Sequence, residues 1–126
     1  MGYFTIVPTL EYAYNKTTAI EHYFDPALIG KQLIYIPAHK VKSSIQVLRQ
    51  HHQLKLEYDL TGTRYDTPDN TQKLTSLHLL NVRYNYLVGK WKYMISVYNI
   101  FNRNYQVVRY FPMPGINAEI KISFTI

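Results

Sequence analysis

The last eleven residues of the chain, 116–126, read INAEIKISFTI and decide the fold class. An apolar residue stands at every even position of this stretch, and a polar residue stands at every odd position. Successive side chains of a β-strand point to opposite faces of the sheet. The alternation therefore predicts a strand with one apolar face and one polar face.

Five earlier stretches show the same period of two, so we predict an all-β chain with about six strands. The predicted strands lie near residues 3–15, 40–50, 53–65, 76–87, 90–108 and 116–126. Several are about ten residues long, which exceeds the usual five or six of globular proteins and matches what a tilted strand needs to cross a bilayer. Pro8 interrupts the first strand and predicts an edge or bulged position for it.

The connections between these strands alternate between long and short. The long ones cover 16–39, 62–76 and 102–115, and the short ones cover 49–52 and 88–90. In an antiparallel up-and-down meander, alternate connections lie at the same end of the sheet. All long loops are therefore predicted at one end and all short turns at the other, which is typical of bacterial outer-membrane barrels.

Composition narrows the function classes. The 126 residues include 13 Tyr and no Cys, and 14 Lys and Arg against 8 Asp and Glu give a net charge of +6. Without Cys, the chain has no disulfides, Cys-ligated zinc, iron–sulfur clusters or thiol catalysis. No apolar run is long enough for a transmembrane helix, and the start, Met1 to Ile6, does not read as a signal peptide.

Aromatic residues cluster on the apolar face beside the short turns. An interfacial girdle needs such residues, because one end of the ring is apolar and the other is polar. We predict a membrane-interface role for Tyr84, Tyr86, Trp91, Tyr93 and Phe124.

Four short motifs resemble those of one family. Residues 99–105, NIFNRNY, and 111–115, FPMPG, resemble the segments around the last two strands of TonB-dependent outer-membrane receptors. Residues 35–39, YIPAH, and 62–65, GTRY, with Asp69-Asn70 are similar to two earlier motifs of that family, in the same order. The positions that carry the two C-terminal motifs are Asn99, Phe101, Tyr105, Pro112, Met113, Pro114 and Gly115.

The resemblance implies that residues 1–126 are the C-terminal strands of a 22-stranded transmembrane barrel. Such a receptor lies in the outer membrane of Gram-negative bacteria and takes up siderophores, cobalamin or similar large ligands. Its expected partners are outer-membrane lipid, the remaining barrel strands, an N-terminal plug, and TonB, which acts through that N-terminal part. We expect this chain to be a fragment without plug or signal peptide, and not to transport alone.

In the parent receptor the ligand contacts long loops and the upper lumen, and Arg side chains there can pair with carboxylate or phosphate. The candidate ligand contacts are Arg64, Tyr65, Arg103, Tyr105, Arg109 and Tyr110. For each of them the alternative is a structural role in ordering the loops and the rim.

Two other functions stay open at this point. A soluble all-β binding module of lipocalin type would bury the apolar face, and a nucleic-acid-binding β domain would use the positive charge. We predict no nucleic-acid binding, because the basic residues are spread along the chain.

Catalytic and metal chemistry find little support in the sequence. Glu57 and Asp59 share the polar face, but no nucleophile and base accompany them, so we predict no enzyme activity. His51 and His52 are adjacent and are predicted to form a solvated turn, while His39 is predicted to have a structural role at a strand start. We expect no metal and no cofactor.

Overall fold

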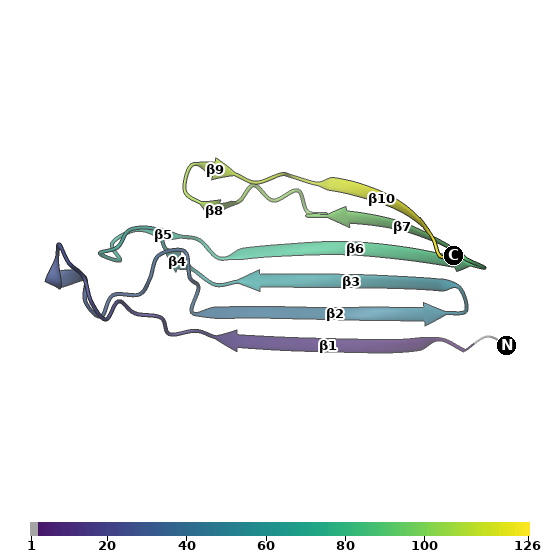
Figure 1. The fold of residues 1–126 in the computed structure, drawn as a ribbon, viewed down its shortest axis with the longest axis horizontal. Helices are drawn as coiled ribbons and strands as arrows, with labels where there is room; N and C mark the ends of the chain where they lie inside the picture. Colours follow the sequence, from purple (N-terminus) through teal and green to yellow (C-terminus); the bar gives the residue numbers. More distant parts are fainter. Residues whose placement is uncertain (1–2) are drawn as a thin grey trace.

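The computed structural model describes residues 3–126, so Met1 and Gly2 of the predicted segment 1–126 lie outside it. The chain forms one six-stranded antiparallel sheet in the order β1-β2-β3-β6-β7-β10 (Figure 1). The strands are β1 (Thr5–Tyr14), β2 (His39–Arg49), β3 (His52–Thr61), β6 (Leu77–Val88), β7 (Trp91–Tyr98) and β10 (Asn117–Phe124). Neighbours in sequence are neighbours in the sheet, which confirms the predicted all-β meander.

The long connections carry small elements of their own. The hairpin of β4 (Arg64–Tyr65) and β5 (Lys73–Leu74) lies between β3 and β6, and the hairpin of β8 (Gln106–Val108) and β9 (Phe111–Pro112) lies between β7 and β10. A 3-10 helix, η1 (Pro26–Leu28), lies between β1 and β2. All three lie at one end of the sheet, and both short turns lie at the other (Figure 1), as the loop lengths predict.

Two predicted strands are too long. The predicted strand 53–65 ends at Thr61, because the Gly62 N–H bonds the His39 carbonyl and Arg64-Tyr65 then pair with β5. The predicted strand 90–108 ends at Tyr98, because Asn99 has a left-handed φ of 51° that no strand accommodates. Of the remaining predicted residues, 99–108, only 106–108 form a strand, which is β8.

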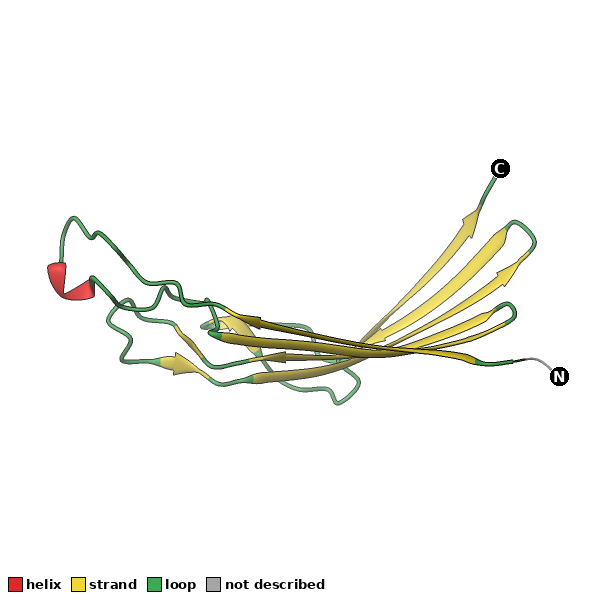
Figure 2. Ribbon diagram, turned by 90° about the horizontal axis from the view of Figure 1, so that it is seen from below, coloured by secondary structure: helices red, strands yellow, loops and turns green. Residues whose placement is uncertain are grey.

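The sheet is open and strongly twisted (Figure 2), with β1 and β10 as its two edges. β1 pairs with β2 without a register shift, and Pro8 faces Ile45. The edge position predicted from Pro8 is therefore confirmed, and no bulge accompanies it. Both edges leave backbone N–H and C=O groups without a strand partner among residues 3–126.

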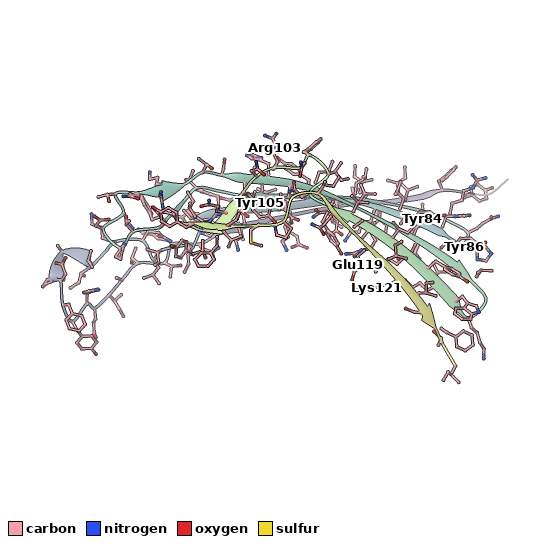
Figure 3. All side chains as sticks on the ribbon, turned by 90° about the horizontal axis from the view of Figure 1, so that it is seen from above. Tyr84, Tyr86, Arg103, Tyr105, Glu119 and Lys121 are labelled. Carbon is pink, nitrogen blue, oxygen red and sulfur yellow. The ribbon has the colours of Figure 1, made fainter. Side chains whose placement is uncertain are left out.

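In β3, β6 and β7 the apolar face of the sheet is more exposed than the polar face. Among the described residues, no Ala, Val, Leu, Ile, Met, Phe, Tyr or Trp side chain is buried, and Ile122 on the apolar face is 60% exposed. On the polar face, Ser96 is 1% exposed and Asn85 is 8% exposed. Figure 3 shows Glu119 and Lys121 on one side of the sheet and Tyr84 and Tyr86 on the other.

Candidate functional site

A row of side chains at the short-turn end of the apolar face runs from Phe4, just before β1, to Phe124 in β10. This ring row consists of Phe4, Arg49, His52, Tyr84, Tyr86, Tyr93, Trp91 and Phe124. At one edge, the guanidinium carbon of Arg49 lies 4.7 Å from the centroid of the Phe4 ring. At the other edge, the Trp91 and Phe124 ring centroids are 4.7 Å apart.

The middle of the ring row is joined through His52. Its Nδ1 lies 2.6 Å from the Tyr84 hydroxyl oxygen in a hydrogen bond, and its ring centroid is 5.0 Å from that of Tyr86. Tyr86 in turn faces Tyr93 across β6 and β7, with centroids 6.4 Å apart. Contacts of this kind hold the rings at a common level along the strands.

The structure brings together all five aromatic residues predicted for the interface. It adds Phe4, Arg49 and His52, which sequence reasoning missed although each shares the phase of the apolar residues in its strand. The prediction that His51-His52 is a solvated turn is wrong for His52, which begins β3 and bonds Tyr84. A membrane role for these residues stays a prediction.

A second band of rings lies at the long-loop end of the same face. This long-loop band consists of Tyr12, Tyr14, His39, Tyr58 and His78. The Tyr12 hydroxyl lies 2.8 Å from His39 Nδ1, and the Tyr58 hydroxyl lies 2.6 Å from His78 Nδ1. Each pair joins neighbouring strands, so His39 has the structural role at the start of a strand that the sequence predicts.

The opposite face carries a network of charged and polar groups. Glu57 accepts from Lys55 Nζ at 3.2 Å and lies 3.8 Å from Arg83 Nη1, while Arg83 Nε donates to Ser96 Oγ at 3.3 Å. The other contacts of this network are Asn81 with Asp59, Tyr98 with Glu119, and Lys121 with Glu119. Glu57 and Asp59 are thus each bound to neighbours on β6.

The two C-terminal motifs contact each other directly. The Asn99 side chain, 2% exposed, donates to the carbonyls of Arg103 at 2.9 Å and Pro114 at 3.4 Å, and it accepts from the Arg103 N–H. Asn102 Oδ1 accepts from the Ile116 N–H at 2.9 Å. The motif residues therefore fix the path by which the chain leaves β7 and enters β10.

The two earlier motifs also meet. The Tyr35 N–H donates to the Tyr65 carbonyl at 2.7 Å, and the Gly62 N–H donates to the His39 carbonyl at 2.9 Å. A Cβ at position 62 would lie 3.0 Å from that carbonyl oxygen, which is tighter than ordinary contact. A glycine is therefore well suited to this position, where the chain leaves β3.

Residues 64–70 connect the three long loops. Arg64, 4% exposed, donates through Nη2 to the Gln106 carbonyl, and the buried Asp66 carboxylate accepts from Arg109 Nε. On the other side, Asn70 exchanges two hydrogen bonds of 2.8 Å with the backbone of Gln32. Burial lowers the pKa of the Arg64 guanidinium by desolvation.

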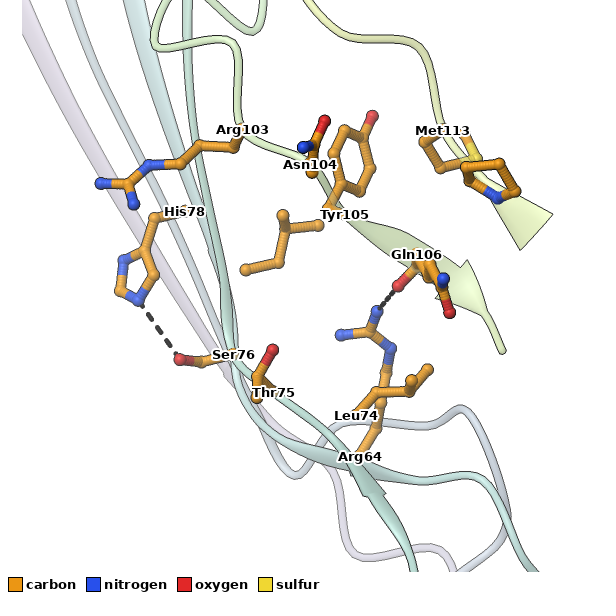
Figure 4. A pocket seen from close by; sticks show the side chains of 12 residues that line it. Arg64, Leu74, Thr75, Ser76, His78, Arg103, Asn104, Tyr105, Gln106 and Met113 are labelled. Carbon is orange, nitrogen blue, oxygen red and sulfur yellow. Dashed lines mark hydrogen bonds between the residues drawn. The ribbon is translucent and has the colours of Figure 1, made fainter. Parts of the chain in front are cut away.

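The candidate ligand contacts are divided between several places. Arg64, Arg103 and Tyr105 line one pocket of about 470 Å³ between β5 and the loop after β7 (Figure 4). Tyr65 lines a neighbouring pocket with Arg64, and the Lys73 Nζ lies 4.9 Å from the Tyr65 ring centroid. In this part of the chain Arg64 and Arg109 serve loop–loop contacts, which is the structural alternative of the sequence analysis.

The sixth candidate, Tyr110, is 82% exposed beside Arg109.

Among residues 3–126, no group of three His, Asp or Glu side chains is arranged to hold a metal ion. No helix in the described part of the chain is long and apolar enough to cross a membrane. In comparisons with known proteins, no family model and no curated protein sequence matches the chain.

Proposed function

We propose that the chain forms the C-terminal strands of a transmembrane β-barrel in an outer membrane. One observation carries this proposal: in β3, β6 and β7 the apolar face is more exposed than the polar face, whose side chains hydrogen-bond one another. A lipid-facing surface must be apolar, and a barrel interior filled with water or a plug is polar. The sheet has the arrangement that this environment requires.

The spacing of the two bands supports the same proposal. His39 and Arg49 mark the long-loop band and the ring row on β2, at its first and last residues. Ten steps at about 3.3 Å each span roughly 33 Å, and a tilt of about 45° projects this onto roughly 23 Å. The outward apolar band of such barrels is about 25 Å tall and is flanked by aromatic girdles.

The type of barrel that we propose is a TonB-dependent receptor for siderophores, cobalamin or similar large ligands. The support is the resemblance of the four motifs, whose residues contact one another in pairs at the strand ends. The free edges of β1 and β10 would then pair with the remaining strands of a 22-stranded barrel. Six strands alone would not transport, and the proposal includes neither an enzyme activity nor a cofactor.

Single-cysteine variants test the membrane orientation, because the chain has no Cys of its own. Lys121→Cys and Ile122→Cys are adjacent on β10 and face opposite sides of the sheet. In vesicles, a membrane-impermeant maleimide should label position 121 and spare position 122, and a lipid-bound nitroxide should quench a fluorophore only at 122. A soluble lipocalin-like module gives a monodisperse monomer without lipid, with position 122 shielded, and that outcome would overturn the proposal.

A further inference from the structure

We propose that the short-turn end of the sheet binds the phosphate headgroups of anionic glycerophospholipids. The binding groups are the Arg49 guanidinium, within the ring row, and the Lys90 ammonium, in the turn between β6 and β7. This inference rests on the membrane insertion proposed above and adds the class of lipid.

The charged side chains at this end all carry a positive charge. Arg49, Lys90 and Lys92 are exposed, and none of them has a carboxylate partner among the described residues. The strand segments that reach this end contain no Asp or Glu. These segments are residues 3–10, 45–56, 82–98 and 120–126.

The nearest carboxylate side chains, those of Asp and Glu, are far from the turns and are already paired. Glu57 lies five residues into β3, where it meets Lys55, and Glu119 lies five residues before Phe124, where it meets Lys121. Five residues correspond to roughly 16 Å along a strand. That distance exceeds the Debye length of about 8 Å at physiological ionic strength, so these carboxylates do little to neutralise the turn.

The long-loop end differs, because acidic residues are interspersed among its basic residues. Its charged residues outside the six long strands are Lys16, Glu21, Asp25, Lys31, Arg64, Asp66, Asp69, Lys73, Arg103 and Arg109. An anionic surface therefore meets acidic as well as basic side chains at the long-loop end, and only basic ones at the short-turn end.

The ring row places the two cations at the depth of lipid headgroups. Aromatic rings of membrane proteins sit at the headgroup level, and the Arg49 guanidinium lies against the Phe4 ring on the same face. A guanidinium donates two parallel N–H groups to a phosphate, while Lys90 supplies a point charge. Lys92 points to the polar face, opposite Ser123, and is not part of the site.

The lipid source follows from the orientation of the proposed barrel. Short turns of outer-membrane barrels face the periplasm. The leaflet on that side is built from glycerophospholipids, so the site is expected to bind these lipids and not lipopolysaccharide.

The only tryptophan of the chain, Trp91, belongs to the ring row and follows Lys90 directly, so it reports on lipid at the site. We would refold the chain into vesicles that contain brominated phosphatidylglycerol or brominated phosphatidylcholine, and measure quenching of Trp91. At low salt we expect a preference for phosphatidylglycerol of about fivefold for each cation, falling as salt is added.

In the double variant Arg49→Gln/Lys90→Gln, both lipids should quench the Trp91 fluorescence equally. Quenching by brominated phosphatidylcholine shows that the variant still inserts. The matched control, Lys16→Gln/Lys31→Gln, loses the same charge at the other end and should keep the preference.

Equal quenching of the unaltered chain by both lipids would overturn this inference alone, whereas no quenching by either lipid would overturn the proposed membrane insertion. A stronger preference for lipopolysaccharide than for phosphatidylglycerol would also contradict the inference.

Discussion

The side-chain oxygen of Asn102 occupies the space that a Cβ at Gly115 would need. A Cβ built on Gly115 would overlap Asn102 Oδ1, the same atom that accepts from the Ile116 N–H at 2.9 Å. The absence of a side chain at 115 is therefore what lets the loop after β7 dock on the start of β10. This relationship gives a physical reason for the pairing of the two C-terminal motifs.

We expect Gly115→Ala to lower the free energy of unfolding by about 1–3 kcal/mol, because Asn102 must move and the Ile116 N–H loses its acceptor. Urea denaturation in detergent micelles, followed by Trp91 fluorescence, measures this. The control is the same change in an Asn102→Gly background, which keeps the positive φ of residue 102 and has no side chain to displace. An equal cost in both backgrounds would contradict the steric explanation.

Asn99 combines a left-handed backbone with three side-chain hydrogen bonds, so its replacement should cost more than that of an ordinary loop residue. Asn99→Ala should destabilise by about 2–4 kcal/mol, from lost hydrogen bonds and backbone strain. Asn99→Gly loses the same hydrogen bonds but tolerates φ of 51°, and should be milder by about 1 kcal/mol. Equal losses for the two variants in micelle denaturation would show that the backbone conformation contributes nothing.

The ion pair between Arg109 and Asp66 should hold the β8–β9 hairpin onto the neighbouring loop. Arg109→Gln leaves a buried carboxylate without its cation, and we expect about 3 kcal/mol less protection of the amides of residues 106–111. Hydrogen exchange measures the loss. Arg103→Gln removes a charge from an exposed side chain of the same loop and serves as control. Unchanged exchange in the Arg109 variant would refute a role in holding the hairpin.

The loop 66–72 should loosen in acid because of Asp69. Hydrogen bonds from the Thr67 hydroxyl, and from the N–H and hydroxyl of Thr71, hold the pKa of the exposed Asp69 carboxyl below its ordinary value of 3.8. A carboxyl with a lowered folded pKa stabilises the loop fully above its unfolded pKa, and this contribution is lost as pH falls through the folded value. The Thr71 amide chemical shift, measured by NMR, should stay constant from pH 7 to about pH 5 and move only in stronger acid.

Asp69→Asn keeps a side-chain oxygen that can accept from Thr71 and removes the titration. The Thr71 amide of this variant should show no transition in that acid range. A transition of the same size in Asp69→Asn would assign the pH dependence to another group.

Much of the sheet could be predicted, because alternation along a strand reports directly on its two faces. Residues 116–126 are the clearest example, and Asn117–Phe124 indeed form β10. The end of β7 could not be found in this way, since the positive φ of Asn99 follows from hydrogen bonds to Arg103 and Pro114 and not from a pattern.

The contacts between the loops could not be predicted from the sequence either. Arg64 and Arg109 were candidates for ligand binding because of their charge, but their partners, Gln106 and Asp66, are more than forty residues away in the chain. Charge indicates which groups a side chain can bind, but the folded arrangement of the loops determines which group it contacts.

If the sheet spans a membrane as proposed, the long-loop band and the ring row set a limit on the thickness of the bilayer that suits it. Because hydrogen bonds between strands fix both bands on one rigid sheet, their separation cannot adjust to the surroundings. A thicker or thinner membrane would have to deform around the protein, at a cost of fractions of a kcal/mol for each Å of mismatch. Membrane thickness itself would then act as a sorting signal, with the protein most stable where the hydrocarbon layer matches the distance between its bands.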